Sequence, residues 1–85
     1  MDYAVFLRPA AVRDLEGLPL HIRRRIEDAI DRLRKDPRPP RCRKLIGFEN
    51  EWRLRVGDYR ILYIIDDPVQ RVTVARVAHR REAYR

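Results

Sequence analysis

The alternation of apolar and polar residues over residues 51–63 predicts a tight β-hairpin. Gly57-Asp58 separates two runs of strand-forming residues, and a two-residue loop that begins with glycine is typical of a type II′ turn. This loop sets the register and places Arg55 opposite Arg60. Because side chains alternate faces along a strand, one face is expected to join the core: Trp52, Leu54, Val56, Tyr59, Ile61 and Tyr63. The opposite face carries three arginines: Arg53, Arg55 and Arg60.

Other periodicities predict one strand and two helices before the hairpin and one strand after it. Residues 3–8 are apolar on both faces apart from the ends of the segment, so we expect a well-covered strand. A short helix begins at Pro9 and a second at Pro19, where the fixed φ of proline suits a helix start. The second helix has an apolar stripe at helical spacing: Ile22, Ile26, Ala29, Ile30 and Leu33. The proline-rich, basic residues 36–44 predict an extended connector, and residues 71–80 alternate as a last strand.

These elements predict one α+β domain over residues 1–85, in the order β-α-α-β-β-β. We expect a four-stranded, mainly antiparallel sheet with a helical hairpin packed on one face.

The charge of the chain indicates which classes of binding partner are favoured. The formal net charge is +7, and arginine supplies 18 of the 20 basic side chains. This balance favours nucleic acid, an acidic protein or an anionic membrane surface as a partner. No apolar run approaches the roughly 18 residues that span a bilayer, so we expect no membrane segment. A single cysteine, Cys42, and the lack of a leader-like segment after Met1 predict a cytoplasmic protein.

The opposed arginines of the hairpin require an explanation, because like charges facing each other destabilise a sheet. An anion there could be a carboxylate of this chain, a carboxylate of a partner, or phosphate, which guanidinium binds with a planar fork of donors. A solvated arginine face is the alternative. Near the C-terminus, His79, Arg80 and Tyr84 are expected either to converge on this face or to form a basic tail.

Several classes of chemistry are disfavoured by the residue inventory. The chain contains no serine, its three glycines are isolated, and its histidines and Cys42 lack metal-ligand spacing. We therefore expect neither metal nor cofactor. A metal-free site rich in arginine and tyrosine suits RNA cleavage, because RNA supplies its own nucleophile, the 2′-OH.

Three stretches carry a resemblance to a known family. "KL" at 44–45, "WRLRVGDYRILYIIDD" at 52–67 and "VAHRREAYR" at 77–85 resemble the RelE/ParE superfamily of bacterial type II toxin–antitoxin toxins. The resemblance implies a toxin neutralised by an acidic antitoxin encoded nearby, in a toxin–antitoxin hetero-oligomer. For the RelE-like branch it implies a ribosome-dependent mRNA endonuclease that inhibits translation without a metal.

The resemblance also implies roles for individual residues. It assigns catalysis to Arg60, Arg80, Tyr84 and Arg55, and RNA binding to Arg53, Lys44 and His79. Arginines stand where the best-studied pattern has lysines, and residues 37–44 contain no acid, although some relatives carry a glutamate base in that connector. Two alternatives remain open: a ParE-like inhibitor of DNA gyrase on the same fold, and a non-catalytic basic RNA-binding module.

Overall fold

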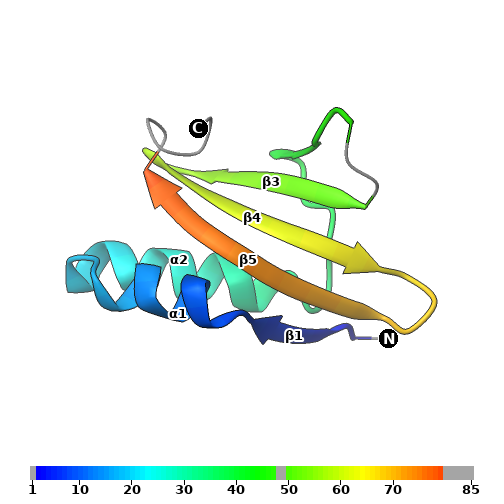
Figure 1. Cartoon of the computed structure of the whole chain (residues 1–85), viewed down its shortest axis with the longest axis horizontal. Helices are drawn as coiled ribbons and strands as arrows, with labels where there is room; N and C mark the ends of the chain where they lie inside the picture. The colour runs from blue at the N-terminus through cyan, green and yellow to red at the C-terminus, as the bar shows by residue number, and fades with distance from the viewer. Residues whose placement is uncertain (1, 48–49, 80–85) are drawn as a thin grey trace.

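The computed structural model describes residues 2–47 and 50–79 and shows two helices on one face of a single sheet (Figure 1). The elements in chain order are β1 (Ala4–Leu7), α1 (Pro9–Glu16), α2 (Leu20–Arg32), β2 (Cys42–Lys44), β3 (Glu51–Val56), β4 (Tyr59–Asp66) and β5 (Arg71–His79). The sheet order is β1-β5-β4-β3-β2. All neighbouring strands are antiparallel except β1 and β5, which are parallel. No helix in the described ranges is long and apolar enough to cross a membrane.

The α+β class, the helical hairpin and the antiparallel β3-β4-β5 meander are confirmed, but the sheet has five strands rather than four. The additional strand, β2, comes from the end of the segment predicted as a plain connector. Pro39 and Pro40 keep the chain extended up to that point. Residues 42–44 keep their backbone N–H groups and can therefore pair with β3.

The hairpin register is the one that the sequence predicts. Arg55 lies opposite Arg60, and Val56 lies opposite Tyr59. Gly57 has a φ of +58°, whereas Asp58 is not among the residues with positive φ. This combination fits a type II′ loop, which needs positive φ at its first residue only.

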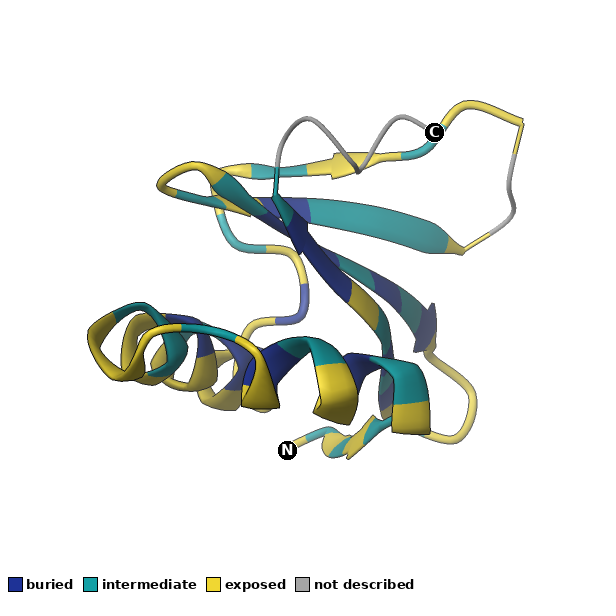
Figure 2. Ribbon diagram, turned by 60° about the vertical axis from the view of Figure 1, so that its left-hand side comes forward, coloured by how far each residue is buried: buried dark blue, intermediate teal, exposed yellow. Residues whose placement is uncertain are grey.

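The core lies between the helices and the sheet (Figure 2). From α2 and its C-cap, Ile26, Ile30 and Leu33 are buried, as the stripe predicts. They belong to one cluster with Leu54, Ile61 and Tyr63 of the hairpin, while Trp52 is half-buried at its margin. Burial of each aliphatic side chain of this kind stabilises the fold by roughly 1.5–3 kcal/mol.

The expectation that the first strand is well covered was wrong. Ala4 and Phe6 of β1 are exposed, and Phe6 keeps 53% of its surface accessible. The reason is the position of β1 at the edge of the sheet, where the helices cover one face only. The Arg71 guanidinium lies 5.6 Å from the centre of the Phe6 ring and covers part of it.

A carboxylate from α1 holds the bulge in β5. The pairing shifts between Leu62 and Tyr63 of β4, which leaves Ala75 as the extra residue on β5. Asp14 accepts hydrogen bonds from Arg76 Nε, from Arg76 Nη2 and from the Val77 backbone N–H, at 2.8, 3.1 and 2.9 Å. Burial raises the pKa of Asp14, but these donors outweigh it and the net pKa is lowered. Asp14 therefore locks α1 onto β5 as an ionised group.

Candidate functional site

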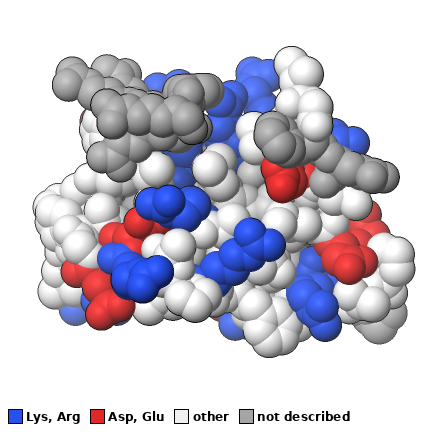
Figure 3. Space-filling view, viewed as in Figure 1, with Lys and Arg blue, Asp and Glu red and all other residues white. Residues whose placement is uncertain are grey.

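A groove lined by arginines lies on the sheet face opposite the helices. Its volume is about 700 Å³ and its lining, called here the arginine groove, consists of Pro40, Arg41, Arg43, Arg53, Arg55, Gly57, Asp58 and Arg60. Five of these eight residues are arginines and one is an acid, so the groove is strongly cationic. In Figure 3, basic side chains appear along the upper part of the molecule, above the sheet, whereas acidic and basic side chains mix lower down.

The groove is built on two pairs of directly opposed arginines. Arg55 of β3 faces Arg60 of β4, and Arg43 of β2 faces Arg53 of β3. Opposed like charges on a sheet each cost some tenths of a kcal/mol up to about 1 kcal/mol. Two such pairs on one face indicate a surface shaped for an anion rather than for stability.

Arg60 forms the buried part of the groove. Only 7% of its surface is exposed, and Arg60 Nη1 donates a hydrogen bond to the Tyr59 carbonyl at 3.4 Å. Arg55, its cross-strand partner, is exposed, and its Nε donates to the Gly57 carbonyl at 3.5 Å. Among the described residues, no carboxylate forms an ion pair with either side chain. Arg60 is therefore a desolvated cation held in place and available to an outside anion.

The segment that carries Arg41 and Arg43 is anchored to the sheet. The buried Tyr63 hydroxyl donates a hydrogen bond to the Pro37 carbonyl at 2.8 Å, and burial raises the pKa of Tyr63 far above its usual value. Arg38 makes a two-pronged ion pair with Asp67, at 2.8 and 3.2 Å. These contacts fix the start of the segment, and pairing of β2 with β3 fixes its end.

Two aromatic side chains reinforce the Arg38 anchor. The Arg38 guanidinium lies 5.0 Å from the centre of the Trp52 ring. The Tyr3 hydroxyl donates to Asp67 at 2.6 Å, and this hydrogen bond to a carboxylate raises the pKa of Tyr3. The anchor thus joins the residue before β1, the connector, β3 and the turn after β4.

The structure brings together three of the seven residues that the resemblance assigned, namely Arg53, Arg55 and Arg60. His79 lies elsewhere: it pairs with Tyr59, and the two rings meet edge to face with centres 5.4 Å apart. Because directly paired residues share a face, His79 lies on the helix side of the sheet and not beside Arg60. Arg80 and Tyr84 lie outside the described residues.

Lys44 is also separated from the groove. It pairs with Trp52, whose face is the one that the helices cover, so Lys44 and Arg43 point to opposite faces of β2. The sequence interpretation missed Arg41 and Arg43 as site residues. The available signal was the alternation in "RCRK", which places two arginines on one face once residues 42–44 are read as a strand.

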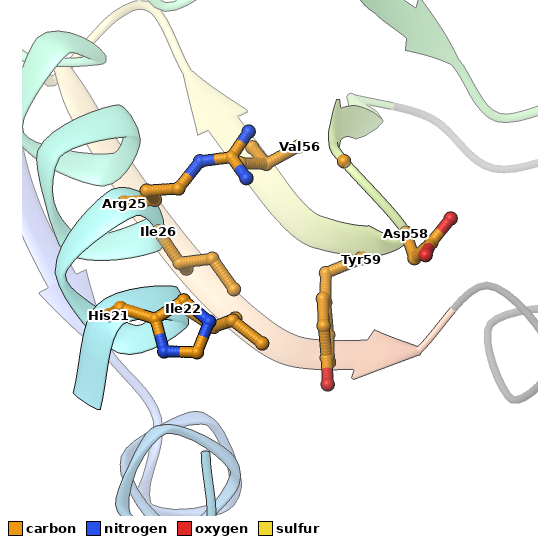
Figure 4. Close-up of a pocket in the computed structure, with 8 residues that line it drawn as sticks. His21, Ile22, Arg25, Ile26, Val56, Asp58 and Tyr59 are labelled. Atoms are coloured by element: carbon orange, nitrogen blue, oxygen red, sulfur yellow. The ribbon is translucent and has the colours of Figure 1, made fainter. Parts of the chain in front are cut away.

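A smaller hollow of about 250 Å³ lies between α2 and the hairpin turn (Figure 4). Arg25 reaches from α2 toward Val56, and its guanidinium would lie 3.7 Å from a Cβ placed on Gly57. Ile22, Ile26 and Tyr59 make much of this lining apolar. Within the described ranges, no group of three or more His, Cys, Asp or Glu side chains is arranged to hold a metal ion. The arginine groove is the candidate site because it gathers five arginines in one lining.

Comparison with known proteins identifies the family. Residues 5–84 match the model of the family described as "ParE toxin of type II toxin-antitoxin system, parDE". The chain belongs to the RelE/ParE superfamily of toxins. It is 38% identical over 89 residues to Toxin RelG of Mycobacterium tuberculosis, a match that covers the whole chain and 99% of that relative.

Solved structures of toxin–antitoxin complexes share the fold of this toxin. The RelBE2 complex from M. tuberculosis contains a chain with a TM-score of 0.82 and 31% identity, covering 93% of this chain and 99% of that one. In the archaeal RelE–RelB complex from Pyrococcus horikoshii OT3, the corresponding values are 0.85 and 28%, with coverage of 96% and 99%. This protein is thus a toxin of a type II toxin–antitoxin system, and its relatives bear RelE-type names.

Proposed function

We propose that this toxin is a ribosome-dependent mRNA endonuclease that inhibits translation. The observation that carries the proposal is the buried Arg60 within a groove of five arginines, with no described carboxylate paired to it. Such a site is preorganised for the extra negative charge of a phosphoryl transition state. The relatives named RelE and RelG support the choice of this branch, and we propose a cytoplasmic location because ribosomes are the target.

The proposed reaction uses the RNA as its own nucleophile. The 2′-oxygen at the cut site loses its proton and attacks the adjacent phosphorus, and the bond from phosphorus to the 5′-oxygen breaks. The 5′-oxygen takes up a proton, so the products are a 2′,3′-cyclic phosphate and a 5′-hydroxyl. The protein must hold the phosphate, stabilise its charge and assist the two proton transfers.

The groove divides these tasks among its side chains. Arg60 binds the scissile phosphate, while Arg55 and Arg53 bind phosphate oxygens nearby. The resemblance adds Arg80 to the charge-stabilising set and Tyr84 to the ordering or deprotonation of the reacting nucleotide. His79 takes no part in phosphate binding in this proposal, because its ring packs against Tyr59 on the helix side.

An acidic antitoxin is the proposed partner, as the complexes formed by the structural relatives suggest. The open sheet face offers both kinds of contact that such a segment needs. Leu62 is half-buried and lies opposite Arg53, and Ile64 follows it on the same face. An amphipathic segment could place apolar side chains there and its acids against the arginines, folding as it binds.

The test of cleavage is the removal of the nucleophile. An mRNA with a single 2′-deoxy or 2′-O-methyl nucleotide at the cut site is presented on the ribosome beside the unmodified mRNA. We expect cleavage of the unmodified message alone, with a 2′,3′-cyclic phosphate end. Undiminished cleavage of the modified message would rule out this mechanism.

The match to the ParE family model keeps inhibition of DNA gyrase as the second candidate function. A supercoiling assay with purified gyrase separates the two. Loss of supercoiling activity together with unimpaired translation would favour the second candidate and would leave the arginine groove without a catalytic role.

A further inference from the structure

Arg41 and Arg43 complete an ordered grid of arginines on the sheet. One row runs across the strands through Arg55 and Arg60, which are directly paired. A second row runs through Arg43 and Arg53, which are also directly paired. Continued by one residue, the pairing of β2 with β3 places Arg41 opposite Arg55, and Arg41 lines the groove beside it.

The spacing of this grid is set by sheet geometry. Neighbouring strands lie about 4.8 Å apart, so the arginines of one row are close enough to share one phosphate. The two rows are separated by two residues along β3, which corresponds to about 7 Å. Successive phosphates of an extended single strand are separated by a distance of this order. The grid therefore matches two consecutive phosphates that follow the direction of β3.

Arg41 and Arg43, the arginines contributed by β2 and the residue before it, have a fixed backbone and exposed side chains. Arg41 and Arg43 are exposed, so their guanidinium groups are accessible to a ligand. Their backbone is fixed by the hydrogen bond from Cys42 N–H to the Pro39 carbonyl at 2.9 Å and by the pairing of β2. Among the described residues, no carboxylate forms an ion pair with Arg41 or Arg43.

One acid defines an end of the grid. Asp58, the single carboxylate in the groove lining, lies in the hairpin turn, beyond the row of Arg55 and Arg60. A carboxylate repels a third phosphate at this end but can accept a hydrogen bond from a ribose hydroxyl. The phosphate path therefore extends from the turn toward the Arg43 row.

We propose that Arg41 and Arg43 are substrate-binding residues, and that the RNA backbone runs along β3 with one phosphate on each arginine row. This inference rests on the proposed action on RNA and adds two residues and a direction to it. The row of Arg41, Arg55 and Arg60 holds the scissile phosphate, and the row of Arg43 and Arg53 holds its neighbour.

The first test measures how salt weakens binding of an uncleavable probe, a single-stranded 2′-O-methyl RNA hexanucleotide. The logarithm of affinity falls with the logarithm of salt by about 0.7 for each phosphate contact on a single strand. We expect Arg41→Ala and Arg43→Ala each to flatten the slope by about that amount. The matched control is Arg24→Ala, which removes the same charge from an exposed position on α2.

The second test asks whether the rows bind different phosphates. The wild-type protein is expected to gain affinity from a 2′-O-methyl dinucleotide, with one phosphate, to a trinucleotide, with two. Arg43→Ala should abolish most of that gain, whereas Arg24→Ala should keep it. An unchanged gain in Arg43→Ala would overturn the direction, and slopes equal to that of Arg24→Ala would overturn the binding role.

These outcomes are independent of cleavage. Because the probes cannot be cut, a failure of the endonuclease proposal leaves the slopes unaffected. Conversely, a loss of mRNA cleavage in Arg60→Ala with normal slopes in Arg41→Ala and Arg43→Ala would refute only this inference. The thermal midpoint provides the folding check, and removal of one of two opposed arginines is not expected to lower it.

Discussion

Arg60 and Arg55 are direct cross-strand partners, yet Arg60 is 93% buried while Arg55 is exposed. The buried member is already desolvated and oriented, so its interaction with a developing charge needs little reorganisation. We expect Arg60→Ala to reduce mRNA cleavage on the ribosome by about 10²–10³-fold, a typical loss for one such donor. Arg55→Ala should cost less, because an exposed guanidinium is screened by water.

The control for this prediction is the fold itself. Arg60→Ala removes a buried charge that has no described carboxylate partner, so the variant is expected to unfold at a temperature no lower than the wild-type protein. Full cleavage by a folded Arg60→Ala would show that the phosphate is held elsewhere.

The anchor at Pro37 predicts a measurable loss of stability. Tyr63→Phe removes the buried hydroxyl that donates to the Pro37 carbonyl and leaves that carbonyl without its partner. We expect the free energy of unfolding in urea to fall by about 1–3 kcal/mol. Tyr59→Phe is the matched control, because no hydrogen bond from the Tyr59 hydroxyl is found among the described residues. Equal effects of the two substitutions would contradict the role of this anchor.

The hydrogen bonds that Asp14 accepts from Arg76 and Val77 predict a pH dependence of the stability of the fold. The folded-state pKa of Asp14 is lowered below its ordinary value of 3.8, so the ionised carboxylate stabilises the fold above that pH. The contribution should disappear as pH falls through the lowered folded pKa. Asp14→Asn should therefore lose about 1–3 kcal/mol relative to wild type at neutral pH. The free energies of unfolding of the two proteins in urea should converge at strongly acidic pH. A difference that stays constant as pH falls would contradict this role of Asp14.

Charge also predicts the kinetics of antitoxin capture. With a net charge of +7 and an arginine groove on the open face, this toxin should attract an acidic segment over a distance limited by salt screening. We expect the association rate measured by stopped-flow to fall steeply between low and high salt, while dissociation changes less. An association rate that is independent of salt would show that apolar contacts alone control the encounter.

The hairpin could be predicted from the sequence because a single two-residue turn determines its register. Gly57-Asp58 fixes the loop, and a slip by one residue would move Leu54 and Ile61 out of the core and arginines into it. The apolar stripe of α2 was equally informative, since Ile26 and Leu33 have no other way to be buried.

The remaining features depend on contacts between distant segments. The alternation in "RCRK" spans only four residues, which is too short to predict a strand without its partner, and the pairing of β2 with β3 is what places Arg43 beside Arg53. The face of His79 depends on the bulge at Ala75, which no local pattern announced. The exposure of Phe6 follows from the place of β1 at the edge of the sheet, which hydrophobic alternation does not encode.

The parallel pairing of β1 with β5 has a consequence for how the toxin folds while it is being synthesised. Ala4 lies in register with Arg71, and its backbone N–H donates to the Gln70 carbonyl at 2.9 Å, so β1, the first strand to be synthesised, can dock only after β5, the last described strand. Until then β4, with its buried Ile61 and Ile65, lacks a neighbour on one side. Topologies with pairings between strands distant in sequence fold slowly, and their unpaired strand edges are prone to aggregation before folding is complete. A nascent chain of this toxin should therefore reach its folded form only after β5 has been synthesised, and β1 stays unpaired until that point.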